Sequence, residues 1–232
     1  MGVFGNEPPM NFFGHAALAA GHFSTLPPRV PGPDLALLCA GAMLPDFISM
    51  LRLGRPAVLD ERVARGVSFH HLTDHAFHEL ASFVSLSREA FAWLSAQQVP
   101  RGPARAVAHI GIEMLLDEVL SSDVDACDAY RAALCAPLDQ ALSFGTPADP
   151  ERLSALRASL LERAATRIEP TAELVAERIR AALAGRPRLA LEAAVQPRLR
   201  SWVALTRPLV VSAAPQLLAT LRAQLANQER PE

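Results

Sequence analysis

The sequence contains no lysine, so all 22 of its basic side chains are arginine. Together with 24 acidic side chains they leave a formal net charge of only −2, which gives no electrostatic reason to expect a nucleic-acid partner. The missing lysine accompanies a high content of alanine, leucine and proline. We attribute this composition to a coding bias, such as that of a GC-rich genome, and attach no function to it.

Cysteine is also scarce. The three cysteines form no Cys-x-x-Cys pair, and their odd number is a poor disulfide framework: Cys39, Cys127 and Cys135. Residues 1–9 lack the basic and apolar regions of a signal peptide. The longest apolar stretch, residues 35–44, is far shorter than the roughly 20 residues of a membrane span, and Asp46 follows it. We therefore expect a cytoplasmic protein with no membrane span.

Runs of alternating polar and apolar residues, which would indicate strands, are lacking too. Helical periodicity dominates, and 232 residues that are 50% hydrophobic are enough to bury a core. We predict an all-α, multi-helix bundle with buried metal-site helices. Its parts are a helical metal-site region over residues 1–144 and a C-terminal helical region over 151–232 that packs on it as one compact domain. The segment 145–150 is the clearest linker.

Glycine and proline divide the expected helices. Asp34 is the expected N-cap of a helix that Pro45 kinks or breaks near its end, and Ser87 is the expected cap of another. The predicted helices cover residues 11–22, 34–50, 60–81, 87–98, 104–120, 123–142, 151–167, 170–184, 188–205 and 207–228.

All seven histidines lie at or before residue 109, so the second half of the chain offers no imidazole. Four of them fall within nine residues. On a helix, His70, Asp74 and His78 form one stripe, and His71 and His75 form another about 100° away. Imidazole and carboxylate one turn apart suit zinc, manganese or iron. The alternative is a polar helix face with a local run of histidine.

A second stripe has the same spacing: His109, Glu113 and Asp117 repeat every four residues in a very apolar segment. A carboxylate in a buried helix is costly unless it is paired or bound to a metal. Metal binding is one interpretation of this stripe, and a salt bridge to an arginine such as Arg105 is the other.

Two single residues complete the candidate site. His15 lies in the first predicted helix, and Asp46 ends an apolar one. Taken alone, His15 is typical of a packed or surface histidine and Asp46 of a cap or turn. We include both as metal ligands because of the other candidate ligands in the same half of the chain.

In order and spacing these features resemble the acyl-carrier-protein phosphodiesterase family, which comprises bacterial helical metal-dependent hydrolases related to HD-domain phosphohydrolases. Four segments match in order: residues 10–15 (Met-Asn-Phe-Phe-Gly-His), 41–47 (Gly-Ala-Met-Leu-Pro-Asp-Phe), 66–74 (Gly-x-x-x-His-x-x-x-Asp) and 113–117 (Glu-Met-Leu-Leu-Asp). A match from Met10 makes residues 1–9 an extension, or Met10 the true start. The chain departs from the family pattern at His71, His78 and Glu118, and its last 80 or so residues are unmatched.

A second resemblance is to the zinc-dependent phospholipase C and P1-type nuclease families. His15, Asp46, the pair His70 and Asp74, and the pair His109 and Glu113 are similar to their early ligand, distant Asp and His-x-x-x-Asp/Glu pairs. Members of both groups hydrolyse phosphoesters. The two resemblances therefore imply one reaction class, with acyl carrier protein or a phospholipid as the substrate.

We therefore expect a metal-dependent phosphodiester hydrolase that uses a metal-activated water and one or two ions of zinc, manganese or iron. Asp117 or His71 is expected to move the proton. The metal ligands of this hypothesis are His15, Asp46, His70, Asp74, His109 and Glu113. His71, His75, His78 and Asp117 are expected to orient the ligands or to substitute for them.

The alternative is a non-catalytic helical binding or scaffold protein that keeps an ancestral fold. One form of it is a lipid or acyl-chain binder, in which phenylalanines beside the cluster line an apolar pocket instead of packing in the core: Phe12, Phe13, Phe47, Phe69 and Phe77.

Overall fold

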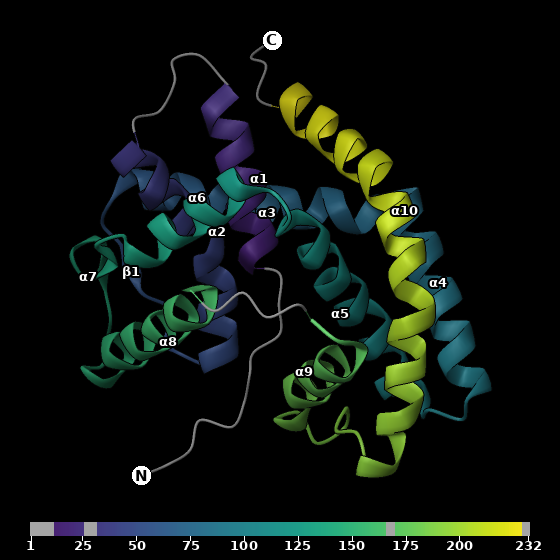
Figure 1. Ribbon diagram of the computed structural model, residues 1–232. Helices are drawn as coiled ribbons and strands as arrows, with labels where there is room; N and C mark the ends of the chain where they lie inside the picture. The colour runs from purple at the N-terminus through teal and green to yellow at the C-terminus, as the bar shows by residue number, and fades with distance from the viewer. Residues whose placement is uncertain (1–11, 26–31, 166–169, 229–232) are drawn as a thin grey trace. The chain divides into compact units, whose positions relative to one another are not determined.

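The computed structural model describes residues 12–25, 32–165 and 170–228 (Figure 1). Over these ranges it contains ten α-helices, a short 3₁₀ turn and a single two-stranded sheet. The prediction of an all-α multi-helix protein is confirmed. The Met10-Asn11 part of the opening motif lies outside the described residues.

The chain divides into two compact units that are interleaved along the sequence. The first, here called the α2 unit, takes its described residues from 12–77, 120–165 and 220–228. The second, the α5 unit, takes them from 78–119 and 170–219. The residues on both sides of the segment 145–150 belong to the α2 unit, so the exchange between units takes place elsewhere along the chain.

In the α2 unit, helices α1, α2 and α6 pack against one another, and α8 packs on α2 and α6. Strand β1 pairs antiparallel with β2, with Ala57 opposite Ser143 and Val58 opposite Leu142. The elements are α1 (Phe12–Thr25), α2 (Gly32–Leu51), β1 (Ala57–Val58), α3 (Glu61–Glu79), α6 (Val124–Cys135), α7 (Leu138–Ala141), β2 (Leu142–Ser143) and α8 (Ala148–Ala165).

Two glycines set the approach of α2 to α3. A Cβ on Gly66 would lie 2.8 Å from the backbone nitrogen of Ala42 and would clash with the Leu38 carbonyl oxygen. A Cβ on Gly41 would lie 3.0 Å from the Val63 Cα atom. The two helix backbones are therefore in direct contact, which only glycine allows at these positions.

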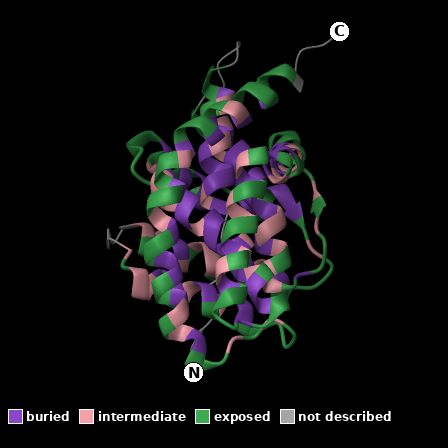
Figure 2. Cartoon of the chain, turned by 90° about the vertical axis from the view of Figure 1, so that its right-hand side faces the viewer, coloured by how far each residue is buried: buried purple, intermediate pink, exposed green. Residues whose placement is uncertain are grey.

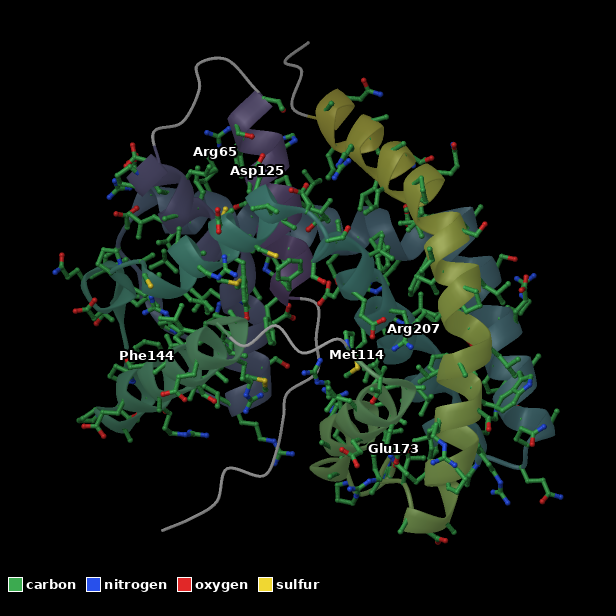
Figure 3. All side chains as sticks on the ribbon, viewed as in Figure 1. Arg65, Met114, Asp125, Phe144, Glu173 and Arg207 are labelled. Carbon is green, nitrogen blue, oxygen red and sulfur yellow. The ribbon has the colours of Figure 1, made fainter. Side chains whose placement is uncertain are left out.

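The α5 unit contains α4 (Ala81–Ala96), α5 (Arg101–Leu120), α9 (Ala172–Ala184), a 3₁₀ turn (Ala193–Val195) and most of α10 (Gln196–Gln228). Trp202, only 1% exposed, lies against Gly111, where a Cβ would overlap the indole ring. Arg207, labelled in Figure 3, donates hydrogen bonds of 2.9 and 3.2 Å to the Glu118 carboxylate. These two contacts fix α5 on α10.

Buried residues recur at helical spacing along each helix, with exposed residues between them (Figure 2). This is the pattern of amphipathic helices that share a core. Phe47 and Trp202 are among the largest side chains that are completely covered, one in each unit.

Several predicted helix boundaries are wrong. Ser87 caps no helix, because α4 already begins at Ala81, after the single extended residue Leu80. Asp34 lies inside the first turn of α2, and α2 continues past Pro45 to Leu51. The two helices expected over 188–205 and 207–228 are one helix, α10, with two internal prolines. A proline in a helix costs about 3 kcal/mol, which tertiary packing offsets where the helix is held in a core.

By length and composition alone, two helical stretches are apolar enough to cross a membrane: Gly32–Leu51, which is α2, and Ala193–Asn227. Half of the apolar window in α2 is buried inside the protein, and the core helix of a soluble protein passes the same test. The expected absence of a membrane span therefore stays a prediction.

We expect Gly66→Ala to lower the free energy of unfolding by about 3 kcal/mol, at the upper end of the range for overpacking, because backbone atoms of α2 cannot move aside as a side chain can. Gly21→Ala is the matched control: Gly21 lies in α1, and a Cβ there has no neighbour within 4 Å. It should stabilise the protein by up to about 1 kcal/mol. Urea unfolding followed by circular dichroism measures both. Equal effects of the two substitutions would contradict the close approach of α2 and α3.

Candidate metal centres

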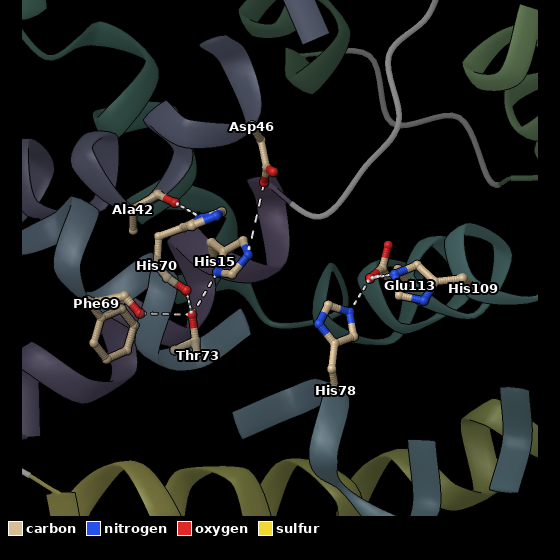
Figure 4. Close-up of polar contacts among 9 residues, drawn as sticks. All are labelled: His15, Ala42, Asp46, Phe69, His70, Thr73, His78, His109 and Glu113. Carbon is tan, nitrogen blue, oxygen red and sulfur yellow. Dashed lines mark hydrogen bonds and ion pairs between the residues drawn. The ribbon is translucent and has the colours of Figure 1, made fainter. Parts of the chain in front are cut away.

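The first candidate centre lies in the α2 unit and consists of His15, Asp46 and His70 (Figure 4). They belong to α1, α2 and α3 respectively, and one potential ligand atom of each lies within 4.8 Å of the other two. His15 and His70 are 3% and 6% exposed, whereas Asp46 is half-buried. Two imidazoles and one carboxylate that converge from three helices are compatible with a divalent metal ion.

The tautomer of His70 follows from its backbone partner. Its Nδ1 atom lies 2.9 Å from the carbonyl oxygen of Ala42 on α2. A carbonyl oxygen only accepts hydrogen bonds, so Nδ1 carries the proton and donates it. In the neutral ring Nε2 then keeps its lone pair. Such a backbone hydrogen bond is the usual way in which a protein orients a metal-binding histidine.

His15 contacts a buried hydroxyl group. The Thr73 Oγ1 atom lies 3.0 Å from the Phe69 carbonyl oxygen and 2.9 Å from that of His70, and Nδ1 of His15 lies 2.8 Å from the same Oγ1 atom. When the Thr73 hydroxyl donates its single proton to either carbonyl oxygen, Oγ1 accepts from Nδ1 of His15, and the lone pair of that ring is on Nε2.

Nε2 of His15 faces a carboxylate oxygen of Asp46 at 4.0 Å. This separation is too long for a hydrogen bond. It is short enough for one ion to bridge, because ligand bonds to zinc measure about 2.0–2.2 Å. The ring of His70 lies beside that of His15, with 4.0 Å between the ring centroids. The donors of this group are thus compatible with a shared divalent cation.

The electrostatic surroundings keep His70 neutral. Burial lowers the pKa of its imidazole, and the hydrogen bond to Ala42 and the charge of Asp74 only partly oppose this shift. A neutral imidazole is the form that binds metal. Asp74 lies one helical turn after His70, so its charge also favours a cation in the same place.

The second candidate centre lies in the α5 unit and consists of His78, His109 and Glu113. Nε2 of His78 and Nε2 of His109 each lie 3.2 Å from the same carboxylate oxygen, Oε1 of Glu113. The two imidazole rings are stacked, with 4.7 Å between their centroids (Figure 4). Glu113 is 6% exposed, so both rings converge on a buried carboxylate.

Glu113 is paired with two histidines. Burial alone would raise the pKa of the Glu113 carboxyl, but the hydrogen bonds and charges of His109 and His78 hold it below its ordinary value. Arg105, the partner in the salt-bridge alternative, is exposed and lies over the ring of Phe91 at 6.0 Å. The carboxylate thus interacts with histidines where the alternative named an arginine, and metal binding at this helix stays a prediction.

The structure therefore groups the predicted residues differently from the two stripes in the sequence. His70 and His78 do not share a centre: eight residues of helix separate them by about 12 Å. The third candidate ligand beside His109 and Glu113 is His78, and not the carboxylate of Asp117 one turn after Glu113. His71 and His75 are exposed, and Asp117 belongs to the α5 unit. The proton-transfer roles of His71 and Asp117 stay predictions.

Thr73 and the carbonyl group of Ala42 are the contributors that the sequence analysis missed. Thr73 is completely buried, although it lies among polar residues in the sequence. A threonine between two candidate ligands was the one available signal. The Ala42 carbonyl gave none, because its role depends on the approach of α2 to α3.

When the chain is compared with family models, with curated proteins and with solved structures, it matches none of them.

We expect Thr73→Val to weaken metal binding at the first centre by about 10- to 100-fold, the usual effect of losing a group that orients a ligand. Valine keeps the volume but leaves Nδ1 of His15 without its acceptor. Thr73→Ser restores the hydroxyl and should restore the affinity. Zinc titration by isothermal calorimetry measures all three proteins. Equal affinities of the valine and serine variants would contradict an orienting role for Thr73.

Proposed function

We propose that the protein is a metal-dependent phosphoester hydrolase whose reaction takes place at the centre formed by His15, Asp46 and His70. The observation that supports this is the convergence of one ligand atom from each residue within 4.8 Å of the other two. The Ala42 carbonyl oxygen holds the Nδ1 proton of His70, so the Nε2 lone pair of that ring is available, and Thr73 contacts Nδ1 of His15. Both histidines are thus held through Nδ1 beside one carboxylate.

The ligand set fits zinc, manganese or iron, because imidazole and carboxylate are ligands that these ions accept. When bound, such an ion polarises a phosphoryl oxygen and lowers the pKa of a coordinated water to about 7. The protein's own contribution is to hold the ligands in place before the ion binds. His15 and His70 are fixed by hydrogen bonds, and Asp46 supplies the negative charge.

His71 is the proton carrier that we propose for this centre. It is exposed, and its ring lies edge-on to that of His70, with 5.2 Å between the centroids. An imidazole titrates near neutral pH, so it can take a proton from the attacking water and release it to solvent. Asp117, the other proposed carrier, belongs to the α5 unit and is not assigned to this centre.

The proposed substrate is a phosphodiester, either of acyl carrier protein or of a phospholipid. This choice depends on the resemblance of four short segments to the acyl-carrier-protein phosphodiesterases, and on the weaker resemblance to zinc-dependent phospholipases. Three of the four matching segments contribute a residue to the first centre: His15, Asp46 and His70. The fourth segment, residues 113–117, belongs to the α5 unit and contributes no residue to this centre.

We expect Asp46→Asn to remove one equivalent of bound transition metal and to abolish hydrolysis of bis(p-nitrophenyl) phosphate. Asparagine keeps the shape of the side chain but loses the charge that the ion requires. Inductively coupled plasma mass spectrometry on tag-free protein, together with the release of nitrophenol, measures the two effects. Asp128→Asn, which removes an exposed carboxylate of the same unit, is the control and should change neither. Metal-free protein after incubation with zinc, manganese or iron(II) would contradict the hydrolase proposal and favour a non-catalytic helical binding protein.

We expect His71→Gln to lower kcat by about 10²-fold or more, the lower end of the effect of a general base, while the bound metal stays in place. The variant should also lose the acid limb of the pH profile of kcat, because glutamine cannot accept the proton. Stopped-assay rates between pH 5 and 9 measure this. An unchanged profile in the variant would exclude His71 as the proton carrier.

A further inference from the structure

We propose that His78, His109 and Glu113 form a metal site of their own, selective for zinc-like ions and with an open coordination position. This site lies in the α5 unit and does not depend on the centre formed by His15, Asp46 and His70. The proposal therefore goes beyond the proposed hydrolase reaction and can be tested separately from it.

The distances match those of ligands around one small ion. Two ligands of a tetrahedral zinc ion, with bonds of about 2.0–2.1 Å, lie about 3.3 Å apart. Each Nε2 atom lies 3.2 Å from Oε1 of Glu113, and all three ligand atoms lie within 4.8 Å of one another. Small movements of the three side chains would place an ion among them without any change in the helix backbones.

The helix that supplies two of the ligands is rigidly held. His109 and Glu113 lie one turn apart on α5, so the helix itself sets their separation. Between them, Gly111 lies against the buried ring of Trp202. Five residues after Glu113, the Glu118 carboxylate accepts two hydrogen bonds from Arg207 of α10. A ligand pair on an element held in this way loses little conformational freedom when it binds metal.

The exposure of the three residues leaves room for a further ligand. The Glu113 side chain is only 8% exposed, whereas those of His78 and His109 are 29% and 44% exposed. Phe83 covers the rings on another side, with centroid distances of 5.3 Å to His78 and 5.5 Å to His109. Three protein ligands with one side open are the pattern of catalytic or exchangeable zinc sites, whereas structural zinc sites are closed by four.

The donor set also determines which metal binds. Two imidazoles and one carboxylate favour zinc, cobalt and nickel over magnesium and calcium, which prefer oxygen ligands. His78 lies near the end of α3 and the other two ligands on α5, so a bound ion joins the end of α3 to α5. Zinc should therefore raise the melting temperature through this site.

The test is a titration of zinc into metal-free, full-length protein, followed by calorimetry and thermal melting. The proteins are wild type, Asp46→Asn, Glu113→Gln and the double variant. We expect two equivalents in wild type, one in each single variant and none in the double variant. Glu113→Gln should weaken zinc binding at its own site at least 100-fold. Asp128→Asn is the control for the loss of one exposed carboxylate and should behave as wild type.

Each outcome has a distinct meaning. One equivalent lost only in Glu113→Gln would support this site and overturn the hydrolase centre. Equal zinc binding by wild type and Glu113→Gln would show that the three residues are only hydrogen-bonded to one another, and would overturn this proposal. One equivalent lost in either single variant would show a single shared ion, which also overturns it.

A second measurement guards against a folding defect in the glutamine variant. Cobalt(II) titrated into Asp46→Asn should give visible absorption bands of a four- or five-coordinate site, and excess magnesium should not displace it. His109→Gln in the same background removes an exposed ligand and is expected to lose these bands while its circular dichroism stays unchanged. Bands that persist in His109→Gln would overturn the assignment of the ligands.

Discussion

The first centre depends on one contact, the direct approach of the α2 and α3 backbones at Gly41 and Gly66. A side chain at either glycine would separate the helices. Without the contact, the Ala42 carbonyl could not accept the Nδ1 proton of His70, and the lone pair of that ring would no longer be fixed. Asp46 lies on the same helix as Ala42, and its distance from His15 depends in addition on the packing of α1 against α2. The need for glycine at positions 41 and 66 thus determines how His70 of the first centre is oriented.

The two centres use the same donor types in different ways. In the first, groups outside the triad orient the histidines: a backbone carbonyl for His70 and a buried hydroxyl for His15. In the second, the two histidines contact the carboxylate itself, and no intervening group is required. The histidines of the first centre are thus contacted by groups that are not candidate ligands, whereas the second centre is a hydrogen-bonded cluster of the candidate ligands themselves. The two centres also differ in burial. The histidines of the first centre are buried, whereas those of the second are partly exposed.

These differences support the two proposed roles. The proposed phosphoester chemistry needs ligands that stay in position while charge develops, and the first centre has groups that contact its histidines from outside the triad. The proposed exchangeable site needs access from solvent, and the histidines of the second centre are partly exposed. Since the centres belong to different compact units, each has its own supporting contacts: the glycine contact of α2 and α3 for one, and Trp202 with Arg207 for the other. Neither site requires the other for its local geometry.

The sequence by itself determined that the protein is helical and which residues are candidate ligands, because periodicity and residue type are local properties of the chain. It named His15, Asp46, His70, Asp74, His109 and Glu113 as candidate ligands without reference to the fold, and all of these except Asp74 belong to one of the two triads. Only the tertiary structure decided how they are grouped. Spacing along a helix shows which side chains share a face, but not which other helix meets that face. The stripe of His70, Asp74 and His78 was therefore divided, since His78 contacts a carboxylate 35 residues away and His70 a carbonyl 28 residues away. Helix ends such as Leu80 and the internal prolines of α10 escaped prediction for the same reason: long-range packing overrides the local preference of the residues.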